Sequence, residues 1–537
     1  MIAPALTLGG ACLYHRGMKT NLLLVCSLCA LLARANEVVL PDQNGVAWWG
    51  GVVTHGNRMP LQNGYTADLT ANNYGNQVAP LLLSARGDVL WCAEPIAYAL
   101  KDGTLRVSSK TGKVERGSGG NTLREAFACA SKKYFPPTGT MPDAALFRQP
   151  QYNTWIELMY DQNQRDVLKY AHAIIGNGFE PGVLMIDDNW QEDYGKWTFH
   201  PGRFPDPKAM MRELHGLGFK VMVWVCPFVS PDSDVYRALA KQQAFLKDAS
   251  GKPAMVRWWN GASALLDFTR PAAVEWFSGR LAALQKEYGV DGFKLDAGDA
   301  DFYPGLVAAK PVSANEHSRL FGQFGLLFPL NEYRAMWQMG GQPLAERLRD
   351  KRHDWADLHK LVPDILQQGL LGYAFTCPDL IGGGEFTSFL DGAKIDQELI
   401  VRSAFCHALM PMMQFSVAPW RVLGPDQLAA VKKATALRAQ YVPTILRLAQ
   451  HAAQTGEPIV RSMEYVFPHQ GYEAVKDQFL LGDDILVAPA LEKGITQRKV
   501  QLPPGTWLDA KGQRHTGPAT ITASAALDEL PVFTRQK

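Results

Sequence analysis

The pattern of apolar and polar positions divides the chain into three parts. Residues 36–150 contain short β-rich runs, such as Ala79–Leu83 and Gly87–Trp91, interrupted by Gly, Asn and Asp. Residues 151–440 alternate between apolar runs and amphipathic segments, and residues 441–537 return to strand-like runs separated by turns. This pattern predicts an N-terminal β-sandwich, a central α/β domain and a C-terminal β domain.

The central part repeats a strand followed by a helix. A helix is predicted to begin at Asp206-Pro207, because Asp caps helices well and Pro suits the first turn, with Met210, Leu214 and Leu217 on one face. Repeated βα units favour a closed parallel sheet, so the predicted fold class is α/β, a (β/α)8 TIM barrel. The expected buried strands are residues 154–158, 183–187, 221–228, 292–296, 345–350, 372–378 and 410–416.

Residues 1–35 have the pattern of an export signal. A short basic start at Met18-Lys19 precedes the apolar run Leu22–Leu32, and Ala33-Arg34-Ala35 forms an A-x-A cleavage site before Asn36. We therefore expect an exported protein, periplasmic or extracellular, with translation starting at Met1 or at Met18. The apolar run is too short to span a bilayer, and we expect no membrane span elsewhere.

Composition narrows the classes of partner. The chain has 54 Lys and Arg against 52 Asp and Glu, which gives no reason to expect nucleic acid. Fourteen Trp is a high count, and exposed aromatic rings stack on sugars. Trp49, in the run Trp48-Trp49-Gly50-Gly51, is either core or a contribution to a neighbouring cleft. The five cysteines beyond the leader are odd in number and scattered, which argues against a disulfide framework or a zinc site.

Carboxylates follow four of the predicted strands. Asp187-Asp188, Asp296, Asp350 and Asp379 each come at or just beyond a strand end, and in a barrel these ends share one rim. A single such residue could equally be the N-cap of the next helix. Carboxylates from four strand ends on one rim would repel each other unless a ligand or cations offset them, and Lys294, Arg347 and Arg349 are placed to do so.

Two carboxyl groups are what glycoside hydrolysis requires, one ionised and one protonated. The chain has no G-x-S-x-G elbow, no phosphate-binding Gly loop and no H-E-x-x-H motif, so other common hydrolytic sites have no support.

Several ordered motifs resemble glycoside hydrolase family 31, over roughly residues 45–510. The motifs are Val183–Asp187, Lys294-Leu295-Asp296, Asp350 with Trp355–Leu358, Gly369–Gly372, Pro378–Gly383, Asp477–Asp484 and Leu486–Pro489. The resemblance implies a retaining α-glycosidase in which Asp296 attacks the anomeric carbon and Asp350 is the general acid/base. The implied mechanism requires no metal and no cofactor, and the implied partner of the protein is an oligosaccharide or glycoside substrate.

The same resemblance assigns substrate contacts. It implies that Asp187, with Arg347 or Arg349, holds sugar hydroxyls and that Trp224 forms part of the wall. We add Asp188, Lys294, Asp379 and Trp49 as candidate substrate-binding residues. Each has an alternative: Trp224 could fill the barrel, Asp188 could cap a helix, and Asp379 could be a turn residue. Asp299 is a rival nucleophile that lies past the strand end.

Two departures from the family pattern bear on the substrate. The glucosidase branch has Trp-Ser-Gly-Asp around its acid/base, whereas this chain has Arg347-Leu348-Arg349-Asp350. That branch also has Arg-Ser-His near its last strand, where this chain has Met412–Ser416. The segment Gln414-Phe415-Ser416 with Pro419-Trp420 resembles the branch that includes the myogenesis-regulating glycosidase and bacterial relatives. The activity of that branch is α-galactosidase, so we expect terminal α-galactosides as substrates. An α-glucosidase, an α-xylosidase and a catalytically silent carbohydrate-binding protein remain alternatives.

Overall fold

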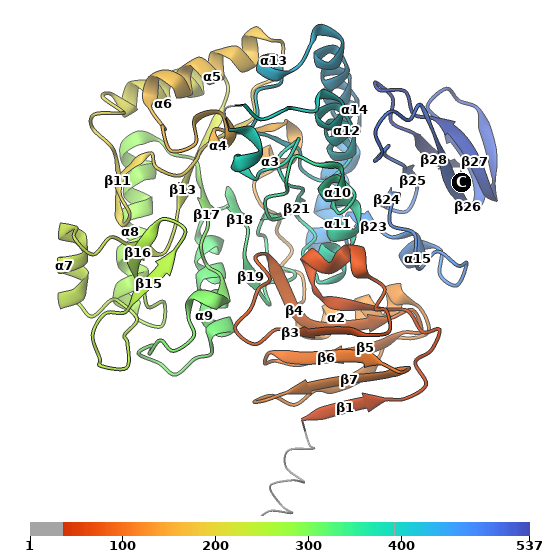
Figure 1. Ribbon diagram of the computed structural model, residues 1–537, viewed down its shortest axis with the longest axis horizontal. Coiled ribbons are helices and arrows are strands. Elements are labelled where there is room, and N and C mark those ends of the chain that lie inside the picture. The colour runs from red at the N-terminus through yellow and green to blue at the C-terminus, as the bar shows by residue number, and fades with distance from the viewer. Residues whose placement is uncertain (1–35, 391, 537) are drawn as a thin grey trace, which may run out of the picture.

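The computed structural model describes residues 36–390 and 392–536. The predicted leader and its cleavage site lie outside the described residues. Within them, no helix is long and apolar enough to span a membrane. A central barrel carries one β domain at the bottom of the view and a second at its right (Figure 1).

The N-terminal domain consists of two mainly antiparallel sheets. One sheet has the order β1-β7-β6-β3, and in the other β4 pairs with β2, β5 and β19, while β5 pairs with β8. Thr122 and Glu125 form a capping box that starts helix α2. The strands are β1 Glu37–Leu40, β2 Trp48–Val52, β3 Tyr65–Asp68, β4 Gln77–Ser84, β5 Asp88–Trp91, β6 Ile96–Lys101, β7 Thr104–Ser109 and β8 Glu115–Ser118, followed by α2 Leu123–Tyr134. The predicted N-terminal β domain is confirmed.

The central domain is a parallel eight-stranded barrel. Its strand order is β21-β20-β18-β17-β13-β10-β9-β22. The seam between β21 and β22 is bridged just beyond β21, where the Ile381 amide donates to the Gln414 carbonyl at 2.8 Å, so the barrel is nearly closed. The strands are β9 Gln151–Asn153, β10 Val183–Ile186, β13 Lys220–Val225, β17 Gly292–Leu295, β18 Asn331–Tyr333, β20 Glu346–Arg347, β21 Thr376–Cys377 and β22 Gln414–Phe415. The predicted TIM barrel is confirmed.

Helices cover the outside of the barrel (Figure 1). The helix predicted at Asp206 begins there: Asp206 accepts a hydrogen bond from the Ala209 amide, and Met210 and Leu214 are buried. The longer helices are α5 Gln164–Gly176, α6 Pro207–Gly216, α7 Asp234–Lys241, α8 Pro271–Tyr288, α9 Ala314–Phe324, α11 Leu361–Leu370, α12 Gln397–Ala408 and α14 Pro425–Thr455. Short helices are α3 Ala145–Arg148, α4 Trp155–Leu158, α10 Trp355–Leu358, α13 Pro419–Val422, and the 3-10 helices η1 Val53–Arg58, η2 Ala300–Phe302, η3 Gly325–Leu327 and η4 Phe386–Phe389.

Small hairpins and strands extend from the strand ends. They are β11 Gln191–Asp193 with β12 Lys196–Phe199, and β14 Phe228–Val229 with β15 Met255–Trp258 and β16 Gly261–Leu265. One further strand, β19 Met336–Trp337, leaves the barrel and pairs in parallel with β4 of the N-terminal domain. The two domains therefore share a sheet.

Two strand predictions were wrong. The first barrel strand is β9, and the residues predicted as a strand, 154–158, form α4 instead, because the Asn153 side chain accepts from the Trp155 amide and turns the chain. Strand β18 was missed. Its sequence, Asn331-Glu332-Tyr333, has no apolar run, since its side chains enter polar contacts inside the barrel.

The C-terminal domain is a six-stranded antiparallel sheet. Its elements are β23 Val460–Arg461, α15 Met463–Val466, β24 Phe479–Leu481, β25 Ile485–Val487, β26 Gln497–Asp509, β27 Arg514–Ser524 and β28 Val532–Gln536. The predicted boundary at residue 440 falls inside α14, which continues to Thr455 and ends at Gly456, a residue with left-handed φ of 77°. The predicted C-terminal β domain is confirmed.

Candidate active site

A cavity of about 530 Å³ opens at the carboxyl ends of the barrel strands. Seven of the nine predicted site residues line it: Asp187, Asp188, Trp224, Lys294, Asp296, Arg347 and Asp350. They come from β10, β13, β17 and β20 or the residues that follow them, which is where a TIM barrel places its working groups. The cavity also contains Asp299, Asp301, Arg334, Arg349 and Glu385, with aromatic walls from Trp155, Tyr160, Trp259, Phe302 and Phe386.

Asp296 is buried and held by cations. Its Oδ1 accepts from the Arg334 Nε at 3.0 Å, and its Oδ2 accepts from the Trp224 Nε1 at 3.1 Å. Burial alone would raise the pKa of this carboxyl, but the charges of Arg334, Lys294 and Arg347 outweigh it and hold the pKa well below its usual value. Asp296 is therefore ionised at neutral pH and fixed in position, as a nucleophile requires.

Asp350 lies in a different environment. Its side chain is 42% exposed, and its Oδ1 accepts from the Arg347 Nη1 at 2.7 Å. The same Nη1 donates to Asp379 at 2.8 Å, and the Arg347 Nε lies 3.3 Å from Glu332. A buried arginine thus joins a solvent-accessible carboxyl in the cavity to two carboxyls beneath it.

Asp187 and Asp188 differ in their charge compensation. Asp187 is paired with the buried Lys294, whose Nζ lies 2.7 Å from its Oδ2. Asp188 accepts from the Asn260 side chain at 2.6 Å and from the Tyr194 hydroxyl at 3.3 Å, both neutral donors. Burial, together with the neighbouring Asp187 charge, raises the pKa of Asp188 to about 7. The helix-cap alternative for Asp188 is wrong, because the hairpin β11–β12 follows it.

Two candidate substrate-binding residues do not line the cavity. Asp379 is fully buried and accepts from the Lys351 and Gly384 amides as well as from Arg347. Burial raises its pKa to about 7, even though Arg347 lowers it. The structure thus places Asp379 as a turn residue that positions Arg347. Trp49 is 5% exposed in β2 and packs in the hydrophobic core, so its side chain does not reach the cavity.

Arg334 was not predicted as a site residue. Its guanidinium binds Asp296, pairs with both oxygens of Asp299 at 2.9 and 2.7 Å, and lies 5.6 Å from the centre of the Trp259 ring. Asp299, the rival nucleophile, is therefore tied up in a two-point ion pair. Arg334 immediately follows β18, so the missed strand also hid this residue. A count of strands was the one available signal, since a closed barrel needs eight and the sequence predicted seven.

Residues of the N-terminal domain form hydrogen bonds with Arg334 and Arg347. The Asn76 side chain donates to the carbonyls of Arg334 at 2.8 Å and Arg347 at 3.0 Å. Gln77 donates to the same two carbonyls at 2.7 and 2.9 Å. The Gly75 carbonyl accepts from the Arg334 guanidinium at 2.9 Å. Residues at the start of β4 therefore fix the backbone at the ends of two barrel strands.

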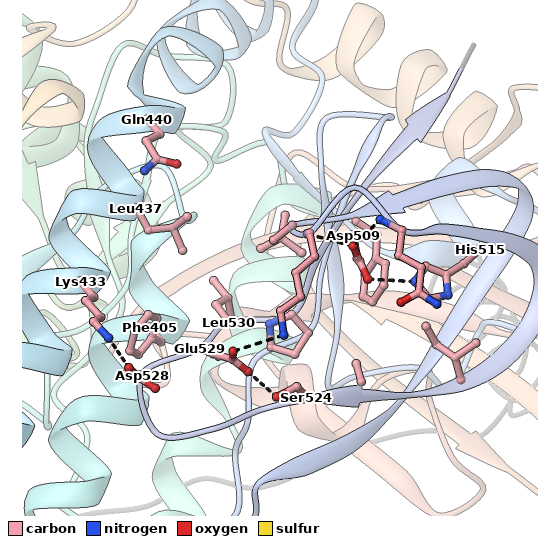
Figure 2. Close-up of a pocket in the computed structure, with 18 of the residues that line it drawn as sticks. Phe405, Lys433, Leu437, Gln440, Asp509, His515, Ser524, Asp528, Glu529 and Leu530 are labelled. Carbon is pink, nitrogen blue, oxygen red and sulfur yellow. Dashed lines mark hydrogen bonds and ion pairs between the residues drawn. The ribbon is translucent and has the colours of Figure 1, made fainter.

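A second large cavity, of about 520 Å³, lies between α14 and the C-terminal sheet (Figure 2). Its charged side chains are paired one to one: Lys433 with Asp528, Lys511 with Glu529, and His515 with Asp509. Lys433, Leu437 and Gln440 project from one helix toward it (Figure 2). None of these cations is shared between two carboxyl groups, as Arg334 and Arg347 are at the barrel rim, so the chemistry points to the cavity at the rim.

The described part of the chain contains no group of three His, Cys, Asp or Glu side chains arranged to hold a metal ion. Its five cysteines are free, and burial raises the pKa of the Cys226 and Cys377 thiols well above the usual value. Both cysteines are buried in the core.

The molecule is thus a TIM barrel with a carboxylate-rich cavity at the carboxyl ends of its strands. Comparison with known proteins shows the family to which it belongs. The glycosyl hydrolases family 31 TIM-barrel domain matches residues 145–347, and the glycosyl hydrolase family 31 C-terminal domain matches residues 456–537. The two matches together cover more than half of the chain. The chain belongs to glycosyl hydrolase family 31.

Individual relatives agree with this assignment. The chain is 37% identical to the myogenesis-regulating glycosidase of Mus musculus over 418 residues, 75% of this chain and 58% of the relative. It is 25% identical to alpha-glucosidase 2 of Bacillus thermoamyloliquefaciens over 443 residues, 75% of this chain and 54% of the relative. The chain thus spans a little over half the length of these relatives.

The fold also matches a solved structure. The Flavobacterium johnsoniae family 31 dextranase, solved in complex with glucose, superposes with a TM-score of 0.82 at 19% identity, covering 93% of this chain and 66% of the dextranase.

Proposed function

We propose that this protein is a retaining, exo-acting α-glycosidase. The observation that carries the proposal is the contrast between two carboxyl groups in one cavity. Asp296 is buried, ionised and held by Arg334 and Trp224, whereas Asp350 is 42% exposed and touches Arg347. A double displacement needs one fixed carboxylate and one carboxyl group that exchanges protons with the leaving oxygen and with water.

The two steps assign the groups as follows. The Asp296 carboxylate forms a bond to the anomeric carbon while the glycosidic bond breaks, and Asp350 transfers its proton to the departing oxygen. Asp350, now ionised, takes a proton from water, and that water breaks the ester to Asp296 with net retention. Lys294 and Arg347 offset the negative charge of the surrounding carboxylates, and Asp187 and Asp188 are placed to accept hydrogen bonds from sugar hydroxyls.

Terminal α-galactosides are the proposed substrates. The sequence resemblance to the branch of the myogenesis-regulating glycosidase supports this choice, as does the 37% identity to that protein. The segment Met412–Ser416, where the glucosidase branch has Arg-Ser-His, contributes no residue to the cavity: Gln414 points inside the barrel and donates to Gln151 and Glu332. No histidine is among the described residues that line the cavity.

A panel of nitrophenyl α-galactoside, α-glucoside and α-xyloside tests the proposal, with release of nitrophenol as the readout. The proposal expects the galactoside to have the highest kcat/KM. Preference for the glucoside or the xyloside would overturn the galactose specificity but leave the α-glycosidase activity standing. The identity to alpha-glucosidase 2 makes α-glucosidase the second candidate. Binding of sugars with no turnover of any of the three would make the protein a carbohydrate-binding protein and overturn the proposed activity.

A further inference from the structure

A smaller cavity of about 380 Å³ adjoins the active site where the N-terminal domain meets the barrel. Arg349 lines both this side cavity and the active-site cavity. It immediately precedes Asp350, the proposed acid/base. In the proposed function Asp350 protonates the oxygen that leaves with the aglycone, so we expect the aglycone near Asp350 and its neighbour Arg349, which lines both cavities.

Glycines allow the N-terminal domain to form one wall of the side cavity. At Gly51, with φ of 78°, a Cβ would lie 1.9 Å from the Tyr98 hydroxyl oxygen, and at Gly56 a Cβ would lie 2.2 Å from the Pro363 carbonyl oxygen. No larger residue fits at either position without displacing a neighbour. The run that begins at Trp48 thus leads into η1, which packs against α11 and brings Thr54 and His55 to the cavity.

The side cavity has an excess of positive charge. Three cations line it, Arg349, Lys351 and Lys360, against two carboxylates, Asp357 and Asp364. Lys351 binds Asp364 at 2.8 Å and Lys360 binds Asp357 at 2.6 Å, so each carboxylate already has a cation. Among the described residues, the exposed Arg349 guanidinium takes part in no hydrogen bond or ion pair, although its charge, after that of Lys351, opposes the rise that burial gives the pKa of Asp364.

The residues behind the wall add to the positive potential. The Arg58 guanidinium lies 4.4 Å from the centre of the Tyr65 ring, with no carboxylate partner in the described structure. The Lys476 Nζ donates to the Asn57 carbonyl at 2.8 Å. Burial, with the charges of Arg58 and Arg349, lowers the pKa of His55 to about 4, so its imidazole is neutral at pH 7 and bonded to the Tyr65 hydroxyl.

We propose that the side cavity is a subsite for an anionic substituent on the aglycone, a carboxylate, phosphate ester or sulfate ester bound by Arg349 and Lys360. This inference rests on the proposed function, because Asp350 as acid/base sets the direction of the aglycone. A guanidinium whose N–H groups are not used in hydrogen bonds to the described residues can bind such groups through paired hydrogen bonds. The ammonium of Lys360, whose side chain is 39% exposed, can serve as a second point of attachment.

The experiment compares two aglycones that differ only in charge. Isothermal titration calorimetry of the full chain uses 4-carboxyphenyl 1-thio-α-galactoside and its carboxamide, because the sulfur linkage resists hydrolysis and keeps binding separate from turnover. We expect the carboxylate to bind roughly tenfold more tightly, the scale of a hydrogen bond to a charged group. The preference should shrink as salt is raised, since the cavity is open to solvent.

Three variants assign the preference to residues. Arg349→Gln and Lys360→Gln should each reduce the ratio of the two affinities toward one. Lys169→Gln, which removes the same charge from the exposed face of α5, should leave the ratio as it is. If Lys360 served only to hold Asp357, its variant would lower the melting temperature without changing the ratio.

The outcomes separate the two proposals. Equal affinities, no binding of the carboxylated compound, or a preference that survives both cavity variants would overturn the anionic subsite. Failure to cleave any nitrophenyl glycoside would overturn the proposed activity while the binding comparison still reports on the side cavity.

Discussion

The molecule contains two cavities of nearly the same volume and very different chemistry. In the cavity at the barrel rim, about 530 Å³, each of two cations is shared between two carboxylates. Arg334 forms ion pairs with Asp296 and Asp299, and Arg347 forms ion pairs with Asp350 and Asp379. The cavity beside α14, about 520 Å³, has its charges in separate pairs. Size therefore says little about function, and shared counter-charges on strand ends distinguish the reactive site.

The largest effect is expected at Asp296, the proposed nucleophile in the cavity at the barrel rim. Asp296→Ala should lower kcat for every substrate by on the order of 10⁴-fold or more, because no covalent intermediate can form. Azide added to this variant should give a glycosyl azide of the opposite anomeric configuration, since it attacks from the side that the carboxylate occupied. Product configuration by NMR is the measurement, and near-normal turnover would contradict the assignment.

Asp350→Ala should have a smaller and selective effect. Natural glycosides should lose about 10²- to 10⁴-fold in kcat, the range of general acid catalysis, while nitrophenyl glycosides, whose leaving group departs without protonation, should be spared in the first step. Azide should restore turnover and give a product of the same configuration as the substrate. Identical azide products from the two variants would show that the roles are wrong.

Arg334→Gln tests the shared counter-charge itself. We expect about a 100-fold loss of kcat/KM, the scale of removing one electrostatic contact to a reacting group. The pKa of Asp296 should rise once its principal cation is gone, so the acidic limb of the pH profile of kcat/KM should move to higher pH. Arg334→Lys keeps the charge and should shift the limb less. An unmoved limb in Arg334→Gln would remove Arg334 from this role.

Asp188 provides a pH-dependent test of stability. Its pKa is about 7 in the folded protein, against about 3.9 unfolded, so the folded state retains a proton that the unfolded state has lost, and stability falls as pH rises from about 4 to 7. Asp188→Asn removes this dependence. The difference in the free energy of unfolding, variant minus unaltered protein, should therefore be about 1–3 kcal/mol larger at pH 8 than at pH 5. Urea denaturation at the two pH values measures this, and an equal effect at both would contradict the raised pKa.

The smallest effect is expected in the other cavity. Lys433→Ala breaks the exposed pair with Asp528 and should cost about 0–1 kcal/mol of stability, because surface ion pairs contribute little. Its kcat/KM should stay within about twofold of the unaltered protein. A tenfold loss would mean that the cavity beside α14 influences catalysis and would end the contrast between the two.

Sequence reasoning reached the fold because long apolar runs such as 183–186 and 220–225 mark buried strands clearly. It brought Asp187, Lys294, Asp296 and Asp350 to one rim because parallel strands place their carboxyl ends together. It missed Arg334 because β18 is three residues long and polar, so hydrophobic periodicity has nothing to detect. It also grouped Trp49 and Asp379 with the cavity, since sequence does not show which side chains point inward.

The contacts from Asn76 and Gln77 to the carbonyls of Arg334 and Arg347 affect how this protein can be divided. They join residues more than 250 positions apart, and β19 completes the same junction from the barrel side. A gene fragment that encodes the barrel alone would leave both arginine segments without their outer support. We therefore expect that an exchange of the barrel between relatives keeps the site intact only when the N-terminal domain is exchanged with it.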